Sequence, residues 1–274
     1  MVLSKVRSYQ QEIMNRFGGL LHKSLFIEFM GFVQYQNVTY PLFCLKSKGE
    51  KNTDFKNVVI SAGIHGEEPG GVYALLEFLK LDISDFTDSY RFLIFPCINP
   101  FGFEYNHRFN PNGHDINRQF KSDGLSSEAT KVMNVLGRKS WKFDFTIDLH
   151  ETDPNWADEG FRTEDNPKTF YMWETCLDKS IRIGDKVIEE VKKIAPVCEW
   201  DKVYDDVNHG GVIWYPEGCG NQVYAQGTTF DAFLATHYTS QSFTLETPCG
   251  WSMEQRVLVH RTALRSILEL KRNV

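Results

Sequence analysis

The chain has 274 residues, of which 42% are hydrophobic and 14% aromatic, which is enough to form one large hydrophobic core. Its 36 acidic and 30 basic residues give a net charge of −6, and no basic cluster occurs, which argues against binding to nucleic acid or to anionic membranes. The sequence shows neither a signal peptide nor an apolar segment long enough to span a bilayer, so we expect a cytoplasmic protein.

The six cysteines are scattered along the chain and form no C-x-x-C pair. In the cytoplasm such cysteines remain reduced and behave as small, partly buried apolar side chains. A disulfide among the last four is the alternative. The residues are Cys44, Cys97, Cys176, Cys198, Cys219 and Cys249.

The N-terminal region predicts a helix followed by a β-hairpin. Apolar residues recur at helical spacing over residues 5–21 and the pattern then stops at a pair of glycines. Two segments rich in aromatic and β-branched residues follow at 24–35 and 38–45, with a plausible tight turn between them.

Downstream of this hairpin, short apolar segments alternate with amphipathic ones, which predicts an α/β fold. We expect strands at 58–62, 91–95, 143–149 and 242–245, and helices at 72–79, 127–136, 181–194 and 254–270. The fold class is therefore a three-layer α/β/α sandwich around a mixed, largely parallel sheet. We expect a single domain over 1–274, in which 1–56 form the helix and hairpin and 57–274 the core. Three stretches without periodicity are expected to be functional loops: 99–123, 151–169 and 200–227.

Two histidines and a glutamate stand where predicted strands end. His65 and Glu68 follow one apolar strand, and His150 closes another. The carboxyl ends of parallel strands share one edge of a sheet, where binding sites gather. Two histidines and one carboxylate are typical of a catalytic zinc site, which keeps a coordination position open. The alternatives are a turn at His65 and Glu68 that only caps the helix beginning near Pro69, and a buried structural imidazole at His150.

Five short motifs occur in order along the chain: H-x-x-E at His65/Glu68, Asn99-Pro-Phe-Gly-Phe103, Asp115-Ile-Asn-Arg118, Asp148-Leu-His150 and Phe243-Thr-Leu-Glu246. With these motifs the sequence resembles the zinc carboxypeptidases of the carboxypeptidase A superfamily, the funnelin-type metallopeptidases. The resemblance runs from about residue 57 to residue 271 and is closest to the shorter bacterial and cytosolic-type members. Each motif alone is weak to moderate, whereas five in the family's order are specific.

The resemblance implies that His65, Glu68 and His150 bind one zinc ion and that Glu246 is the general base. Zinc lowers the pKa of water to about 7, so a neighbouring carboxylate can accept its proton and return it to the leaving amine. The alternative for Glu246 is an exposed glutamate at the end of a strand.

The resemblance also assigns four residues around the metal. Asp115 would hydrogen-bond the outer nitrogen of His65 and fix its tautomer. Asn117 and Arg118 would bind the terminal carboxylate of the substrate, since a guanidinium offers a planar two-pronged donor. Arg108 would stabilise negative charge on the scissile carbonyl oxygen. The alternatives are a turn aspartate at position 115 and a surface arginine at position 108.

Two further residues bear on the substrate. Tyr224 resembles the mobile tyrosine that closes over bound substrate in relatives; its competitors are Tyr204, Tyr215 and Tyr238. Asp231 lies in the region that sets the preference for the C-terminal side chain. If Asp231 faces the pocket, we expect lysine, arginine or diaminopimelate there, and if Phe230 faces it, we expect an apolar side chain.

The chain departs from the family's pattern at two positions. Phe101 stands where many relatives carry aspartate, and Glu67 stands where the pancreatic enzymes carry an arginine that contacts the substrate. An acidic group at the mouth of the site would disfavour acidic substrates and favour a cation.

These features predict a zinc-dependent hydrolase, a metallocarboxypeptidase or peptide amidase, that cleaves the amide bond next to a C-terminal residue with a free carboxylate. One alternative is an N-acyl amino-acid deacylase of the aspartoacylase or succinylglutamate desuccinylase type. Such deacylases usually continue into a β-rich domain, whereas the residues after Glu246 are expected to form one helix. A non-catalytic zinc- or peptide-binding module is the second alternative, and the presence of Glu246 and Arg108 argues against it. The expected partner is a peptide or a small acyl-amino acid.

Overall fold

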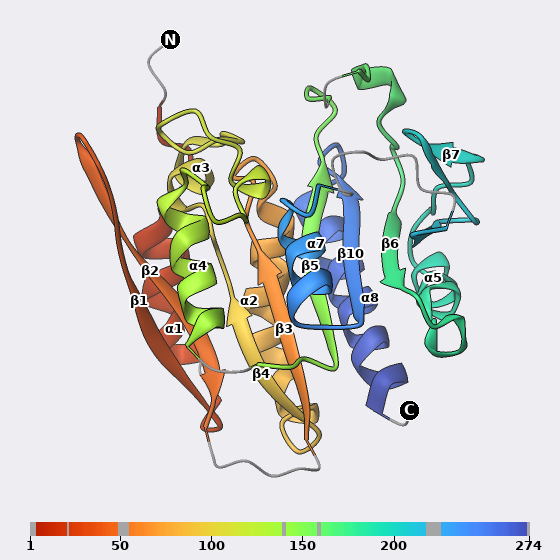
Figure 1. Ribbon diagram of the computed structural model, residues 1–274, viewed down its shortest axis with the longest axis horizontal. Coiled ribbons are helices and arrows are strands. Elements are labelled where there is room, and N and C mark those ends of the chain that lie inside the picture. The colour runs from red at the N-terminus through yellow and green to blue at the C-terminus, as the bar shows by residue number, and fades with distance from the viewer. Residues whose placement is uncertain are drawn as a thin grey trace.

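The computed structural model describes residues 4–20, 22–48, 55–138, 141–157, 160–217 and 226–272 (Figure 1). Its centre is an eight-stranded sheet. In spatial order the strands are β1 (Leu25–Tyr35), β2 (Val38–Ser47), β4 (Tyr90–Phe95), β3 (Lys56–Ala62), β5 (Phe145–Thr152), β10 (Gln241–Pro248), β6 (Tyr171–Cys176) and β9 (Val212–Tyr215). A separate two-stranded ribbon is formed by β7 (Lys202–Val203) and β8 (Asp206–Val207).

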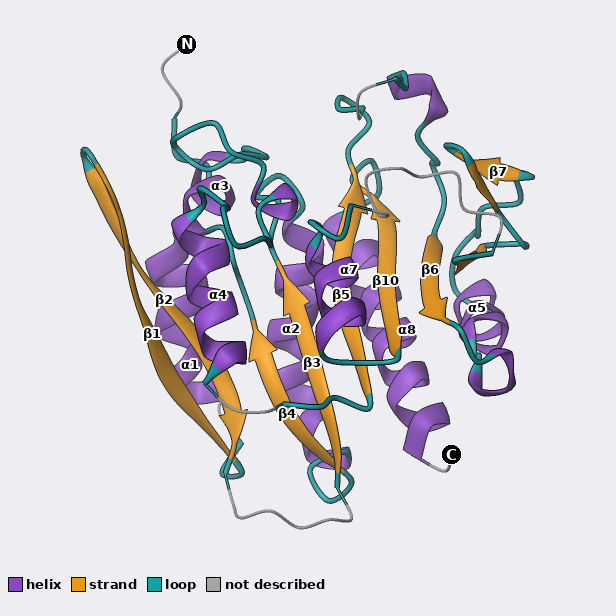
Figure 2. Cartoon of the chain, in the orientation of Figure 1, coloured by secondary structure: helices purple, strands orange, loops and turns teal. Residues whose placement is uncertain are grey.

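The four central strands β4, β3, β5 and β10 are parallel to one another. In Figure 2 the arrowheads of β3, β5 and β10 point to the same edge of the sheet. The flanking strands run the other way: β2 is antiparallel to β4, and β6 is antiparallel to β10. The mixed, largely parallel sheet predicted from the sequence is therefore confirmed.

Helices cover both faces of the sheet. One face carries α1 (Asn15–Leu20), α2 (Pro69–Leu81), α5 (Gly184–Lys192) and α8 (Met253–Arg272). The opposite face carries α4 (Ser127–Gly137) and α7 (Phe230–His237), which lie in front of the sheet in Figure 1. The short helix α3 (Pro100–Tyr105) follows β4. Single helical turns lie at Gln10–Met14, Ile83–Asp85, Ile116–Arg118, Thr163–Asp165 and Lys179–Ile181.

The central strands are largely buried because both of their faces are covered. Val58, Val59 and Ile60 of β3 are fully buried, and every residue of β5 is buried. One hydrophobic cluster extends from Tyr9 of the N-terminal region to Leu268 of α8. The predicted hairpin is confirmed, and through β2 it extends the same sheet.

The structure differs from the predicted elements at the N-terminus, in several elements that were not predicted, and in residues 99–123, which were expected to form a loop but contain helix α3 and the helical turn Ile116–Arg118. At the N-terminus a helical turn begins at Gln10 and the α-helix only at Asn15, instead of residue 5. Strand β6 and helix α7 were not predicted, because both are buried in the sandwich and show no amphipathic alternation. Strands β7, β8 and β9 are too short to show a period.

Five cysteines lie among the described residues and all carry free thiols, so the structure supports reduced cysteines rather than a disulfide among them. Cys219 falls outside the described residues. Among the described helices, none combines the length and the apolar character needed to cross a membrane.

Candidate active site

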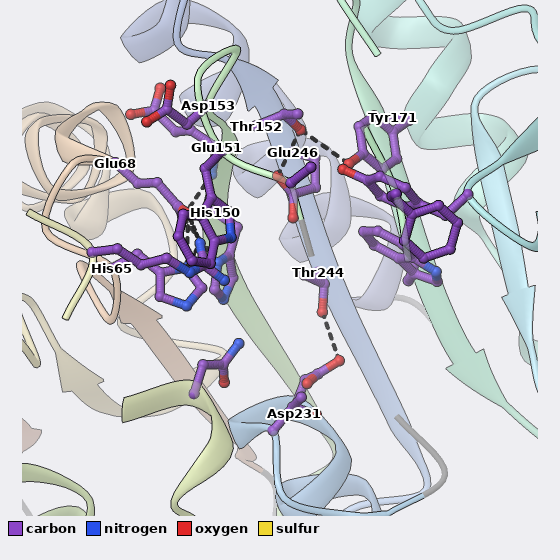
Figure 3. Close-up of a pocket in the computed structure, with 18 of the residues that line it drawn as sticks. His65, Glu68, His150, Glu151, Thr152, Asp153, Tyr171, Asp231, Thr244 and Glu246 are labelled. Carbon is purple, nitrogen blue, oxygen red and sulfur yellow. Dashed lines mark hydrogen bonds and ion pairs between the residues drawn. The ribbon is translucent and has the colours of Figure 1, made fainter. Parts of the chain in front are cut away.

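Three side chains predicted to bind a metal converge at the carboxyl edge of the sheet. His65 lies in the turn after β3, Glu68 is the residue immediately before α2, and His150 lies near the end of β5. They come together because β3 and β5 are adjacent parallel strands. All three are buried, and one ligand atom from each lies within 4.8 Å of those of the other two (Figure 3).

The orientation of the two imidazoles suits a divalent ion. The two Glu68 carboxylate oxygens face one histidine each: Oε1 is 2.7 Å from Nδ1 of His65, and Oε2 is 3.0 Å from Nδ1 of His150. The outer nitrogens meet aspartates: Nε2 of His65 is 3.2 Å from Asp115 Oδ1, and Nε2 of His150 is 3.1 Å from Asp148 Oδ2. In the tautomer that donates Nε2–H to the aspartate, each ring turns an Nδ1 lone pair toward one shared point.

Electrostatics at this point favour positive charge. Burial opposes ionisation of Glu68, yet the facing imidazoles outweigh burial and hold its pKa well below the usual range. Burial likewise disfavours the charged form of His150, but Asp148 and Glu68 raise its pKa well above the usual value. Buried carboxylates that gather around two nitrogen ligands are what a dication requires. The residues therefore fit the predicted zinc ion.

Asp148 is a partner of His150 that the sequence analysis did not assign. It lies two residues before His150 on β5, so both side chains project from the same face of the strand. Ser61 Oγ donates a hydrogen bond of 2.7 Å to Asp148 Oδ1 and fixes the carboxylate. The two-residue spacing in Asp148-Leu-His150 was the available signal.

Glu246 reaches the site from β10. Its Cα is paired with that of His150 on the neighbouring strand β5, which brings residue 246 next to one of the predicted ligands. Thr152 Oγ1 donates a hydrogen bond of 3.2 Å to Glu246 Oε2, and the Tyr171 hydroxyl lies 3.0 Å from the same Thr152 oxygen. Since Thr152 has one hydroxyl proton, Tyr171 must donate to Thr152 when Thr152 donates to Glu246. Desolvation raises the pKa of Glu246 to about 8.

Arg108 lies beside the ligands, on the loop after α3. Its Nε donates to Asp115 Oδ2 at 3.1 Å, and its Nη1 is 3.2 Å from Nδ1 of His65 and 3.4 Å from Glu68 Oε1. The guanidinium also lies 5.2 Å from the centre of the Trp156 ring. The side chain is only 10% exposed, so the surface alternative for Arg108 does not hold.

The structure corrects the expectation for Glu67. Its carboxylate is buried and not among the described groups that line the pocket. Glu67 Oε1 lies 3.5 Å from Arg108 Nη1, and within the described part of the chain Oε2 has no hydrogen-bond partner. The Glu67 side chain therefore faces Arg108 instead of the pocket.

Asn117 and Arg118 occupy a helical turn at the pocket wall. Asp115 caps this turn by accepting a 2.9 Å hydrogen bond from the Asn117 backbone N–H. The Phe230 backbone N–H donates to Asn117 Oδ1 at 2.8 Å, which leaves the Asn117 amide NH2 as the group free to donate to a ligand. Arg118 lines the same pocket, with Nη1 3.1 Å from the Asn117 carbonyl oxygen.

Asp231 faces the pocket and Phe230 does not. Asp231, at the start of α7, accepts a 3.1 Å hydrogen bond from Thr244 Oγ1, and Figure 3 shows both below Glu246. Phe230 is fully buried and packs against Phe95 and Phe120. The pocket, of about 290 Å³, therefore has an acidic group at one end. Burial raises the pKa of Asp231, so a cation placed beside it would favour the ionised form.

Five aromatic side chains, here called the aromatic wall, also line the pocket. Its members come from β6, from the loop after β5 and from the turn between β7 and β8: Trp156, Phe161, Tyr171, Trp173 and Tyr204. The sequence analysis named only Tyr204 among them, as a competitor for the closing tyrosine. Tyr215 and Tyr238 do not line this pocket, and Tyr224 lies outside the described residues.

Comparisons with known proteins bear on the family and on the fold. Residues 54–169 match the family model of the succinylglutamate desuccinylase/aspartoacylase catalytic domain, a segment that contains the three predicted metal ligands. No curated protein matches the chain.

Solved structures share the fold over nearly the whole chain. A protein from Shewanella amazonensis assigned as a metallopeptidase has a TM-score of 0.73 and 23% identity, over 94% of this chain and 92% of that chain. A metallo-carboxypeptidase from Burkholderia cenocepacia has a TM-score of 0.64 and 18% identity, over 96% and 69%. A metallo-carboxypeptidase from Pseudomonas aeruginosa, in complex with (2-guanidinoethylmercapto)succinic acid, has a TM-score of 0.61 and 19% identity, over 94% and 67%. The chain therefore has the α/β fold of the metallo-carboxypeptidases, and the predicted resemblance is confirmed at the level of the fold.

Proposed function

We propose that the protein is a zinc-dependent hydrolase that removes a C-terminal residue with a free carboxylate from a peptide or a related amide. The observation that carries this proposal is the convergence of His65, Glu68 and His150 on one point, with Glu246 and Arg108 beside it. A site that served only to bind zinc would not need a raised-pKa carboxylate and a buried arginine next to an open pocket.

In this proposal His65, Glu68 and His150 hold the ion, and Asp115 and Asp148 orient the two imidazoles. The ion supplies Lewis-acid activation of water and of the carbonyl group. Glu246 accepts a proton from the attacking water and delivers it to the leaving nitrogen, so that amide and water become a carboxylic acid and an amine. The hydrogen bond from Thr152 orients the Glu246 carboxylate through Oε2.

Arg108 would stabilise the negative charge that develops on the carbonyl oxygen. Its guanidinium is held by Asp115 and lies against the Trp156 ring, so the cation needs little reorganisation during the reaction. Asn117 and Arg118 would bind the terminal carboxylate, with the Asn117 NH2 and the Arg118 guanidinium as donors.

The side chain of the released residue is proposed to be cationic, as in lysine, arginine or diaminopimelate. Asp231 provides a carboxylate in the pocket, and the aromatic wall provides ring faces that attract cations. The Pseudomonas aeruginosa metallo-carboxypeptidase was solved with a ligand whose name contains a guanidino group, which is a cation of this kind.

An N-acyl amino-acid deacylase remains the second candidate. It is favoured by the match of residues 54–169 to the succinylglutamate desuccinylase/aspartoacylase catalytic domain. Both reactions use the same metal ligands and base, and they differ in the acyl group that the pocket must accept. We also propose a cytoplasmic location, where the free thiols of the described cysteines would remain reduced.

A substrate screen tests the proposal. The zinc-loaded protein is incubated with peptides that end in lysine, arginine or leucine, each with a free or an amidated C-terminus, and with murein tripeptides and N-acyl amino acids. We expect release of the basic C-terminal residue from the free peptides and inhibition by a chelator. Hydrolysis of N-acyl amino acids alone would favour the deacylase, and no hydrolysis of any amide would contradict a hydrolase.

A further inference from the structure

An N-terminal arm, residues 4–9, lies against α3 next to the turn that contains two of the metal ligands. We propose that Arg7 in this arm is a positioning residue that holds the turn between His65 and Glu68 and thereby sets how tightly the metal is retained. This inference rests on the proposed metal site.

The Arg7 guanidinium contacts both the ligand turn and α3. Nη2 donates to the Gly66 carbonyl oxygen at 2.9 Å and to Asn106 Oδ1 at 2.8 Å, and Nε donates to the Phe103 carbonyl oxygen at 2.7 Å. The guanidinium also lies 5.0 Å from the centre of the Phe103 ring. One side chain therefore ties the residue between the two ligands to the end of α3.

The turn is held on both sides of Gly66, because the Asn99 N–H donates to the Gly63 carbonyl oxygen at 2.8 Å and the Glu151 N–H donates to Glu68 Oε2 at 3.0 Å, and Arg7 adds a contact at Gly66 itself. Residues between the end of β3 and the start of α2 belong to no helix or strand, and Gly66 is buried directly against α3. A Cβ at Gly66 would lie 1.8 Å from the carbonyl carbon of Gly102, so the two backbones are in close contact. A buried carbonyl in such a turn needs a donor, and Arg7 supplies it for Gly66.

The arm itself is fixed to α3 by the backbone. The N–H groups of Val6 and Arg7 donate to the Glu104 carbonyl oxygen at 2.8 and 3.2 Å, and the Tyr9 N–H donates to Glu104 Oε1 at 3.0 Å. Asn99, which caps the N-terminus of α3, also holds the loop of the candidate oxyanion residue, because its Nδ2 donates to the Arg108 carbonyl oxygen at 3.1 Å. Helix α3 thus contacts both the turn between His65 and Glu68 and the loop that carries Arg108, and Arg7 links that turn to the helix.

Arg7 could influence zinc binding through its hydrogen bonds or through its charge, and the two predict opposite effects of its removal. Arg7 is a cation near a cation site, so if only its charge mattered, its removal would strengthen zinc binding. If its hydrogen bonds hold the turn, its removal lets His65 and Glu68 move and weakens zinc binding. Loss of an outer-shell contact typically weakens metal binding by about 10- to 100-fold.

The test measures the rate of zinc release to a chromophoric chelator from the full-length zinc-loaded protein. R7M keeps the aliphatic stem and removes the donors, and we expect it to release zinc about 10- to 100-fold faster than the wild type. The matched control is R261M. Arg261 bonds Glu77 and Asp82 at 3.0 Å, near the other end of the helix that Glu68 precedes, and we expect R261M to release zinc at the wild-type rate.

R7Q is measured in parallel, since its shorter amide cannot span the three acceptors. If R7M does not fold, the zinc-release rate of R7Q relative to the wild type tests the inference instead. Release at or below the wild-type rate would overturn the inference, and equal acceleration in R261M would reduce it to general destabilisation and overturn it as well. His65→Ala distinguishes a failure of the proposed metal site from a failure of the proposed role of Arg7. If the wild type binds no zinc that depends on His65, the proposed function fails, whereas if it does and R7M behaves as wild type, only the role of Arg7 fails.

Discussion

The two walls of the pocket differ in how the fold builds them. The metal wall consists of the proposed ligands His65, Glu68 and His150, which follow or end the adjacent parallel strands β3 and β5 and are surrounded by hydrogen-bond partners. The aromatic wall is assembled from loops and from strand β6, which was not predicted. The proposed metal-binding groups therefore stand at positions that the backbone topology fixes, whereas substrate preference depends on side chains that loops bring together.

The largest effect is expected at the metal wall, from Glu246→Gln. Removing the proton acceptor should lower kcat by about 1,000-fold and leave the zinc content unchanged, because Glu246 is not one of the three ligands. Steady-state kinetics and metal analysis check both parts. Glu254→Gln, an exposed change on α8, is the control. Full activity in Glu246→Gln would remove Glu246 as the base.

Arg118→Ala should act on binding. We expect kcat/KM to fall by about 100-fold for peptides with a free C-terminal carboxylate, mainly through KM, because the guanidinium that pairs with the carboxylate is lost. Amidated peptides should lose much less. The exposed Arg162→Ala provides the matched control. Equal losses on free and amidated peptides would argue against a carboxylate clamp.

Asp231→Asn tests how the pocket selects the C-terminal side chain of the substrate. The change keeps the shape of the side chain and removes its charge, so the preference for lysine or arginine over leucine should fall by about 30-fold. Turnover of the leucine peptide should change little, since Asp231 does not touch the ligands. An unchanged preference would mean that the cationic side chain binds elsewhere.

A smaller effect concerns how the free energy of unfolding depends on pH through a buried histidine. His260 of α8 is fully buried with Nε2 2.9 Å from Thr247 Oγ1, and burial lowers the pKa of His260 to about 3 from its usual 6.5. The unfolded chain therefore binds a proton here below pH 6.5 that the folded chain does not accept until the pH nears 3. The free energy of unfolding should thus fall as the pH decreases through this window.

Urea unfolding of the wild type and of His260→Gln between pH 7.5 and 5 measures this contribution. The variant should show a smaller decrease than the wild type, because it has no group to protonate at this position. Parallel pH profiles for the two proteins would contradict a neutral, buried His260.

Much of the metal wall could be predicted because the end of an apolar strand can be recognised in the sequence. His65 and His150 each close such a strand, and Glu246 closes a third, so the parallel sheet brings them to one edge. Asp148 was missed even though its two-residue spacing from His150 places it on the same face. Glu67 was placed at the mouth, but the sequence does not show that its side chain faces Arg108 instead.

The aromatic wall could not be predicted for a physical reason. Its residues lie far apart between positions 156 and 204, and none belongs to a periodic pattern. Their proximity depends on the antiparallel pairing of β6 with β10 and on the β7–β8 turn, both of which depend on long-range contacts. The same holds for Arg7, whose role depends on packing against a helix that lies about 95 residues away along the chain.

Metal analysis of the purified protein tests the central claim most directly. We expect one zinc ion per chain in the wild type, loss of that zinc in His65→Ala and His150→Ala, and full retention in the exposed control His237→Ala. Zinc that stays bound after both ligand substitutions, or a wild type that binds none when zinc is supplied, would contradict the account.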